Sequence, residues 1–563
     1  MKANKYLLLV SSLGALALLI GAAVEENVFK DWRRIQGSAK SPAGGIEVHL
    51  RQIVVPALRV TDRCISCHVG MAPGESGPSG APVLGPHPNV VHDPANFGCT
   101  VCHAGQGRAT ETADAHGDVP HWPRPMIPKA FAYAGCGSCH THLQVPHLAL
   151  LHRGHSLFEQ YDCLACHRLN GRGGTLRPAS GVAGGGMEGP DLSRIGGTGY
   201  RSDWYEDHLA RRLSAGTQAG AKAKEEAWRM SFGAIPEGDR QALAVFLSSQ
   251  VGAPGLTEAK ALFHSLGCRG CHRVGGVGGD DGPDLTLEGE RDPGRLDFTH
   301  VPGKATLANW LAEHFRAPAT LVPGSKMPAL GLAEDEIRLL TFYMLSLRRS
   351  DVPEAFWPKD RIRAERFGER EFSSDGATLY GTFCAACHGS VGQGMRYPGM
   401  PPFPAIANPD FLALASDDFL AATVRGGRPG RRMPAWGEKD GGLRPGEIVE
   451  VVSHVRRQGG VRPEPDRKPR RWARGDPDEG VRLFTAFCAS CHGARGEGKE
   501  GPALNNKVLL SNASDTYLAE TIRRGLRGTV MEGFANPSTV RAALSGPEIE
   551  SIVTYLRTWE VGK

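Results

Sequence analysis

The sequence has no cysteine outside one repeated motif, few aromatic side chains, little net charge and a single long uncharged run. Aromatic residues make up 7% of the 563 residues, and the net charge is only +5. Such a small charge gives no argument for a nucleic-acid partner. With 73 glycines and so few aromatic residues, a plain polypeptide would bury too little apolar surface for cores of ordinary size. The composition therefore favours a large apolar group that supplies part of the core.

All fourteen cysteines fall into seven copies of Cys-x-x-Cys-His. In this motif the two thiols bond to the two vinyl groups of one porphyrin, and the next histidine ligates the iron from one face. A thioredoxin-like dithiol or half of a zinc site would not require a histidine after the second cysteine every time. The sequence therefore predicts seven covalently bound haem c groups, held by Cys64/Cys67/His68, Cys99/Cys102/His103, Cys136/Cys139/His140, Cys163/Cys166/His167, Cys268/Cys271/His272, Cys384/Cys387/His388 and Cys488/Cys491/His492.

The long uncharged run covers residues 6–24, between Lys5 and Glu25. A run of this length can cross a bilayer as one helix. A cleaved signal peptide is the alternative, because residues 21–23 are small and could form a cleavage site. We favour a retained anchor in the cytoplasmic membrane, since the run is longer than the usual apolar core of a signal peptide, about 7–15 residues. Either alternative exports the rest of the chain and leaves the haems on the periplasmic side.

The motif spacing changes near residue 160. The first four motifs start 35, 37 and 27 residues apart, whereas the later starts are 105, 116 and 104 residues apart. Short gaps leave too little chain for one domain per haem, so three haems must share one loop-rich module. The longer period is an internal repeat of one-haem domains. The sequence predicts a mainly α-helical chain with an anchor or signal at 1–30, a three-haem module at 31–154, four domains at 155–252, 253–350, 374–459 and 476–563, and linkers at 351–373 and 460–475.

Each long repeat has the same internal order. A Gly/Pro loop follows the haem motif, and an amphipathic segment, a methionine and a final helix come after it. These four all-α units resemble the class I cytochrome c domain, in which an opening and a closing helix cross next to the haem. The closing helices are expected at 236–247, 332–345, 444–455 and 545–556, and the opening helices include positions 157–158, 262–263, 379–380 and 483–484.

The class I resemblance implies that a methionine thioether is the sixth iron ligand of each repeat. The expected ligands are Met230, Met327, Met433 and Met531. Met327 and Met433 stand directly before a proline, as in the family pattern. Met230 lacks that proline but keeps the right distance from the closing helix, with Met187 and His208 as alternatives for its haem. The other interpretation of any of these methionines is that it only fills a gap in a core.

The three-haem module offers nine histidines beyond those of its motifs: His49, His87, His92, His116, His121, His142, His147, His152 and His155. Most histidines are solvated or hydrogen-bonded, so most of these should have no ligand role. The first three motifs, with His87-Pro88, His92 and Ala115-His116-Gly117, resemble the multihaem cytochromes of bacterial quinol-oxidising membrane complexes that contain a cytochrome b and a Rieske protein. This resemblance nominates His87, His92 and His116 as distal ligands, although Asp93 stands where proline is expected. His147 and His155 compete, and the pairing with individual haems stays open.

Methionine ligation raises the potential of a haem, so the bis-histidine module should be low in potential and the four later domains high. The resemblance implies a relay that takes electrons from a quinol-oxidising complex with cytochrome b and Rieske subunits to a soluble periplasmic or surface acceptor. Every iron has a candidate sixth ligand, so no catalytic residue is expected. Two alternatives stay open: a reductase whose haem at Cys163/Cys166/His167 is five-coordinate, and a conduit for extracellular electron transfer without a cytochrome b.

Overall fold

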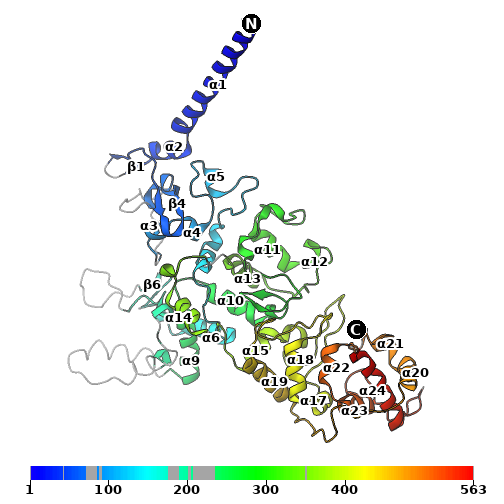
Figure 1. Cartoon of the computed structure of the whole chain (residues 1–563). Coiled ribbons are helices and arrows are strands. Elements are labelled where there is room, and N and C mark those ends of the chain that lie inside the picture. Colours follow the sequence, from blue (N-terminus) through cyan, green and yellow to red (C-terminus); the bar gives the residue numbers. More distant parts are fainter. Residues whose placement is uncertain are drawn as a thin grey trace, which may run out of the picture.

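The computed structural model describes residues 2–41, 44–71, 85, 87, 90, 92–165, 167–174, 189–198, 200, 204–206, 209, 235–348, 351–539 and 541–561. The described chain is mainly helical, and its strands form short antiparallel pairs. Figure 1 shows the N-terminal helix projecting from the body, with the C-terminal domains at the opposite end of the molecule. The mainly α fold expected from the sequence is confirmed.

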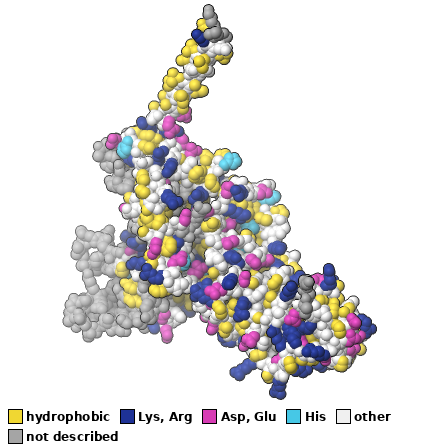
Figure 2. Space-filling view, in the orientation of Figure 1, with side chains coloured by type: hydrophobic (Ala, Val, Ile, Leu, Met, Phe, Trp, Pro, Cys, Tyr) yellow, Lys and Arg dark blue, Asp and Glu magenta, His cyan; other side chains and the backbone are white. Residues whose placement is uncertain are grey.

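Helix α1 (Lys2–Val28) has no packed face among the described residues. Its large apolar side chains are exposed, with Leu7 at 70% and Leu18 at 78%. The helical stretch that contains it is long and apolar enough to cross a membrane, and Figure 2 shows the rod as mostly hydrophobic. Helix α2 (Asp31–Ser38) follows and buries Trp32 and Gln36 against the body. The membrane-length helix expected at residues 6–24 is therefore present.

The three-haem module is built from short turns and hairpins. Its elements are β1 (Lys40–Ser41) with β2 (Gly44–Gly45), β3 (Ile53–Val55) with β4 (Val60–Asp62), η1 (Pro56–Leu58), η2 (Cys64–Ser66), η3 (Val69–Met71), α3 (Pro94–Phe97), α4 (Thr100–His103), α5 (Thr112–His116) and η4 (Lys129–Ser138). The carboxylate of Asp62, on β4, accepts hydrogen bonds from the backbone N–H groups of Cys99 and Thr100 at 2.5 and 2.8 Å. The strand that leads into the first motif therefore also holds the start of the second.

Four pairs of opening and closing helices follow, and each pair packs face to face. They are α6 (Leu148–Gln160) with α9 (Glu237–Ser248), α10 (Leu256–Ser265) with α13 (Glu334–Ser346), α15 (Gly376–Phe383) with α19 (Pro445–Gly459), and α20 (Pro477–Phe487) with α24 (Gly546–Val561). In α19 the buried apolar side chains recur at Ile448, Val451, Val452 and Val455, which is the spacing of one helical face. The closing helices expected from that periodicity are confirmed.

The first two domains share one local plan around the motif. Their further elements are η5 (Cys163–Ala165), β5 (Arg168–Leu169), β6 (Arg172–Gly173) and η6 (Ile195–Thr198), then η7 (Cys268–Gly270), β7 (Arg273–Val274), β8 (Val277–Gly278), η8 (Glu288–Glu290), η9 (Pro293–Arg295), α11 (Leu307–Arg316) and α12 (Pro318–Leu321). In both domains the proximal histidine is followed directly by a hairpin of two strands with two residues each. The hairpin turns the chain back toward the Gly/Pro loop.

The last two domains share another plan, with α16 (Ala385–His388), α17 (Pro409–Leu414) and α18 (Asp417–Gly426) matched by α21 (Ala489–His492), α22 (Lys507–Asn512) and α23 (Asp515–Arg524). Ser416 and Ser514 cap α18 and α23, each accepting a hydrogen bond from the backbone N–H three residues later. One hydrophobic core contains Tyr380 and Leu412 of the third domain together with Leu510 and Val553 of the fourth. These two domains are therefore packed as one body.

Both expected linkers are packed against the domains around them. The first contains η10 (Glu354–Phe356) and α14 (Lys359–Phe367), in which Arg361 and Ala364 are buried. In the second, Trp472 and Ala473 join the core of the fourth domain, and the indole N–H of Trp472 donates to Thr516 at 2.9 Å. The chain between the domains is thus held by specific contacts at both places.

Candidate haem sites

One cavity of about 2030 Å³ runs through the three-haem module. The cysteines and histidines of the first three motifs all line it: Cys64, Cys67, His68, Cys99, Cys102, His103, Cys136, Cys139 and His140. Three further histidines line it, and they are His87, His92 and His116. The three nominated distal histidines therefore share one apolar cavity with the three motifs.

Each nominated histidine faces one motif histidine across this cavity. The ring centroids lie 6.4 Å apart for His68 and His116, 6.1 Å for His103 and His87, and 6.3 Å for His140 and His92. Two imidazole nitrogens that share one metal through bonds of about 2 Å place their ring centroids roughly 6 Å apart. All three pairs thus have the separation that a shared iron would require, and each pair joins a different motif.

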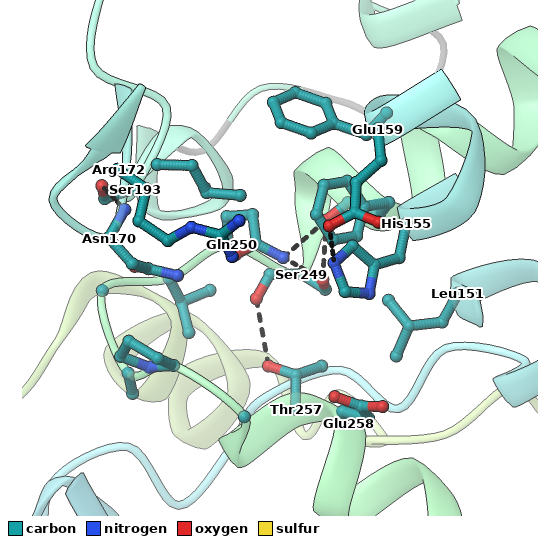
Figure 3. Close-up of a pocket in the computed structure, with 18 of the residues that line it drawn as sticks. Leu151, His155, Glu159, Asn170, Arg172, Ser193, Ser249, Gln250, Thr257 and Glu258 are labelled. Atoms are coloured by element: carbon teal, nitrogen blue, oxygen red, sulfur yellow. Dashed lines mark hydrogen bonds and ion pairs between the residues drawn. The ribbon is translucent and has the colours of Figure 1, made fainter. Parts of the chain in front are cut away.

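The remaining histidines of the module lie elsewhere. His152 and His155 line a second cavity of about 260 Å³, which is below the range of roughly 300–1,000 Å³ for ordinary ligand pockets. Figure 3 shows His155 and Glu159 of α6 on one side of it, with Thr257 and Glu258 below. The His155 ring stacks on Phe246 at 5.1 Å and lies 3.7 Å from Glu159. His155 therefore has a packing role in the described chain, and His147 precedes α6 as its N-cap residue.

In all four later domains the proximal histidine donates its Nδ1–H to a proline carbonyl. The Nδ1···O distances are 2.9 Å for His167 and Pro190, 2.9 Å for His272 and Pro283, 2.9 Å for His388 and Pro404, and 2.8 Å for His492 and Pro502. Because a carbonyl can only accept, this bond fixes the proton on Nδ1 and leaves Nε2 as the ligating nitrogen. The sequence predicted the Gly-Pro loops, but it did not predict that their proline carbonyls orient the proximal histidines.

Three of these prolines are preceded by a glycine, and the reason for glycine at these positions is steric. A Cβ added at Gly189, Gly282 or Gly501 would collide with the ring of His167, His272 or His492. The proximal ring therefore packs directly against the backbone of the loop. The third domain departs from this pattern, because Phe403 precedes Pro404 and the Gly-Pro signal is missing there. That loop could not be recognised from the sequence.

The predicted attachment cysteine Cys491 is placed differently from those of the three-haem module. It lines neither of the two cavities described above, and it forms no disulfide. Its sulfur accepts a hydrogen bond from the hydroxyl of Ser490 at 3.8 Å, a contact that the motif alone did not predict. Its carbonyl accepts from the N–H of Gly501 at 2.9 Å, just as the carbonyl of Cys271 accepts from that of Gly282 at 2.9 Å. These bonds tie the motif to its Gly-Pro loop, while haem attachment at Cys491 stays a prediction.

The methionine loops of the last two domains have matching backbone geometry. The N–H of Arg428 donates to the carbonyl of Met433 at 2.9 Å, and the N–H of Leu526 donates to that of Met531 at 2.8 Å. A glycine with positive φ precedes each loop, Gly427 at 59° and Gly525 at 67°. Met327 of the second domain packs against the core that surrounds α10 and α13. Met230, Met187, His208 and Cys166 lie outside the described residues.

The motifs contact one another as well as their own domains. Cys99 of the second motif packs against the hydrophobic cluster that contains Ile65 of the first motif. At Gly135, an added Cβ would collide with the carbonyl of Cys102, and at Gly137 with that of Ser346 in α13. The first motif therefore contacts the second, the second contacts the third, and the third also packs on the second cytochrome c domain.

The donor groups fit haem c better than a zinc site. Burial lowers the pKa of His103, His140, His272 and His388, so these imidazoles are neutral as ligation requires. Burial raises the pKa of Cys268 and Cys384 to about 12, which keeps the free thiols protonated. No group of three or more His, Cys, Asp or Glu side chains that could hold a bare metal ion occurs in the described parts of the chain. Each motif instead presents two thiols and one imidazole.

Two family models match the repeats. The model described as Cytochrome c matches residues 151–250 and 256–348, and the model described as Cytochrome C oxidase, cbb3-type, subunit III matches residues 373–455 and 475–556. Each matched segment covers one pair of opening and closing helices, apart from the first three residues of α6 and the last residues of α19 and α24. The Cytochrome c model matches the first two domains, which share one local plan, and the cbb3-type model matches the last two domains, which share the other.

The chain is 35% identical over 179 residues to the Cbb3-type cytochrome c oxidase subunit FixP of Bradyrhizobium diazoefficiens, covering 30% of this chain and 57% of that protein. It is 26% identical over 239 residues to subunit CcoP of Azospirillum sp., covering 39% and 71%. The chain thus spans little more than half the length of FixP. A chain of the reducing HAO-like protein complex of Kuenenia stuttgartiensis is 18% identical, covers 33% of this chain and 96% of its own, and has a TM-score of 0.23.

Cytochrome c domains thus occupy most of residues 151–556, and such domains imply covalently bound haem c. Together with the seven motifs, they identify the protein as a multihaem c-type cytochrome with a role in electron transfer.

Proposed function

We propose that the protein binds seven haem c groups and relays electrons from a quinol-oxidising membrane complex, containing a cytochrome b and a Rieske protein, to a periplasmic or surface acceptor. Haem c supplies a redox iron that cycles between Fe(III) and Fe(II). The observation that carries the proposal is the set of three histidine pairs in one cavity of the three-haem module, whose helices α3, α4 and α5 lie toward the end of the molecule that bears α1 (Figure 1).

In this proposal the residues of the chain set the order of potentials. His68 with His116, His103 with His87, and His140 with His92 would hold three low-potential irons. Met230, Met327, Met433 and Met531 would complete the coordination of four irons at higher potential, opposite His167, His272, His388 and His492. Since α3, α4 and α5 of the three-haem module lie toward the α1 end and the third and fourth cytochrome c domains lie at the opposite end (Figure 1), the gradient would run outward from the anchor.

Helix α1 would keep the chain in the cytoplasmic membrane, with the haem domains on the periplasmic side. The exposed apolar side chains of α1 support this placement, because such a surface is stable in hydrocarbon and costly in water. Recovery of the protein only with detergent, and a mature N-terminus upstream of residue 6, are the expected results. A mature N-terminus near Val24 would contradict the anchor but leave the export of the chain untouched.

A second candidate function is electron delivery to a terminal oxidase. It rests on the similarity of the last two domains to cbb3-type oxidase subunits. The two functions differ in their partners. Mild detergent purification of the native assembly, followed by subunit identification, should recover a b-type cytochrome with a Rieske protein for the first and the other subunits of a terminal oxidase, without a Rieske protein, for the second.

The haem count and the coordination are tested on the purified chain. The intact mass of denatured protein should exceed the polypeptide mass by seven haems, because the attachment is covalent. The reduced protein should not bind carbon monoxide if all irons are six-coordinate. Carbon monoxide binding at one haem would favour the reductase alternative, in which the haem of the fourth motif keeps an open position.

A further inference from the structure

The chain between the second and third cytochrome c domains returns to the three-haem module. After α13 ends at Ser346, the first part of the segment 354–371 lies along the side of the large cavity. Its residues Ala355, Phe356, Trp357, Pro358, Lys359, Asp360 and Arg363 all line that cavity. A segment expected to be a linker therefore forms part of the cavity wall.

An aromatic chain connects this segment to the third histidine pair. The ring of Phe356 meets that of Phe97 edge to face at 5.5 Å, and Phe97 lies 4.8 Å from His92. His92 in turn faces His140 at 6.3 Å. Phe356 also packs against the hydrophobic cluster of Ile53, Val55 and Ile65, and Ile65 lies inside the first motif. The phenyl ring of Phe356 thus supports the position of His92 through Phe97.

Charged groups of the same segment face the third motif. The buried guanidinium of Arg361 lies 4.0 Å above the Trp357 ring and acts electrostatically on Cys139. Asp360 lines the same cavity as Cys139 and His140 of the third motif. One negative and one positive side chain of the segment are therefore within electrostatic range of the third motif.

The far end of the segment is fixed to the residues that follow the third motif. The carbonyl of Glu371 accepts from the N–H of Val145 at 2.6 Å, and the carbonyl of Arg370 accepts from the Gln144 amide at 2.8 Å. Lys260 donates both to the carboxylate of Glu371 at 2.6 Å and to the carbonyl of Leu143 at 2.9 Å. The segment therefore holds the third site from both ends.

We propose that residues 354–371 complete the third haem site, with Phe356 and Trp357 as its wall and Asp360 as a positioning residue that sets the potential of the haem held by His140 and His92. This inference rests on the proposed histidine ligation. A carboxylate beside an iron stabilises Fe(III) over Fe(II), so Asp360 keeps this potential low. The assembly of the N-terminal module then depends on sequence more than 200 residues after its own third motif.

The test is a spectroscopic redox titration of the full-length holoprotein and of two matched variants. Asp360→Asn should raise the midpoint potential of one low-potential haem and leave the others nearly unmoved. Asp466→Asn makes the same charge change in the second linker, where Asp466 caps the N–H of Lys468, and should move no low-potential haem. Phe356→Ala should broaden or shift one low-spin signal in electron paramagnetic resonance, because the support of His92 is lost.

The outcomes separate the two proposals. Seven haems by mass and three low-potential transitions in the unmodified protein support the histidine ligation. Suppose that the unmodified protein meets both expectations, but Asp360→Asn and Phe356→Ala each leave all three low-potential haems unchanged. The proposed role of the segment is then overturned, while the histidine ligation still holds. A shift that falls on a high-potential haem would also overturn it. Fewer than three low-potential haems in the unmodified protein would instead contradict the proposed function.

Discussion

Gly270 of the fifth motif packs against Phe383, the residue before the sixth motif, across the boundary between the second and third cytochrome c domains. The turns that carry them are packed tightly, because an added Cβ at Gly270 would lie 3.1 Å from the carbonyl oxygen of Phe383 and 3.6 Å from the Cβ of Ala386. These two motifs therefore meet back to back. This contact links the second cytochrome c domain, which packs on the three-haem module, to the third domain, which packs with the fourth.

Gly270→Leu should separate the fifth and sixth motifs. The larger side chain cannot fit beside Phe383 without moving one turn, which we expect to lower the free energy of unfolding by about 1–3 kcal/mol. Electron redistribution between the two high-potential domains should also slow, as followed by absorbance after rapid partial reduction. Gly238→Leu, at a position on α9 with no atom within 4 Å, serves as the control. Equal rates in both variants would argue against this contact as the transfer route.

His116→Met should convert one low-potential haem to a higher-potential one. His116 faces His68 at 6.4 Å, and replacing a distal imidazole by a thioether raises the potential of its own iron. The near-infrared band of sulfur-to-iron charge transfer should gain about one quarter, since four methionine-ligated haems are proposed. The control is His121→Met, an exposed histidine of the same module that does not line the cavity. A similar gain in both variants, or in neither, would contradict the ligand role of His116.

The sequence predicted the motifs and the helices well because both depend on short-range patterns. Cys-x-x-Cys-His specifies one turn, and the buried face of α19 recurs within one helix. The pairing of distal and proximal histidines could not be predicted in this way. His116, which follows the second motif, faces His68 of the first, and His92, which precedes the second motif, faces His140 of the third. Such crossed pairs depend on how loops of the whole module fold around one cavity.

The first linker shows a second limit of sequence reasoning. It was expected only to connect two domains, yet Arg361 is only 4% exposed and Phe356 packs beside Phe97. Amphipathic side chains such as arginine bury their stems wherever an aromatic face and a counter-charge are available. Whether such partners exist depends on the distant module against which the linker folds. Composition alone cannot supply that information.

Met433→His should lower the potential of one high-potential haem. Met433 lies at the end of a loop closed by the hydrogen bond from the Arg428 N–H to its carbonyl, and axial-ligand identity acts mainly on its own iron. The near-infrared sulfur-to-iron band should lose about one quarter of its intensity. Met400→Leu is the control, because the sulfur of Met400 already accepts a hydrogen bond from Arg432 at 3.0 Å. Survival of the full band in the Met433 variant would show that this methionine only packs against the haem.

Glu371→Gln should destabilise the junction of the three-haem module with the second and third domains, in a pH-dependent manner. The Glu371 side chain is 19% exposed and pairs with Lys260 at 2.6 Å and with Arg269. Burial alone would raise the pKa of Glu371, but Lys260 and Arg269 hold it well below the usual 4.5. Removing one partner of such a buried network leaves cations without a counter-charge, which costs about 3–5 kcal/mol of unfolding free energy.

The sign of the pH dependence follows from the lowered pKa of Glu371. A carboxyl group whose pKa is depressed in the folded state contributes its full stability above its unfolded value, here 4.5, and loses it as the pH falls toward the folded value. Denaturant midpoints should therefore differ between the native protein and Glu371→Gln at pH 7, and this difference should shrink below pH 4.5. Glu369→Gln, which removes the exposed pair with Arg363 at 2.8 Å, should change the unfolding free energy by only about 0–1 kcal/mol. A difference for Glu371→Gln that is the same at pH 7 and pH 3 would mean that the carboxylate charge does not stabilise this junction.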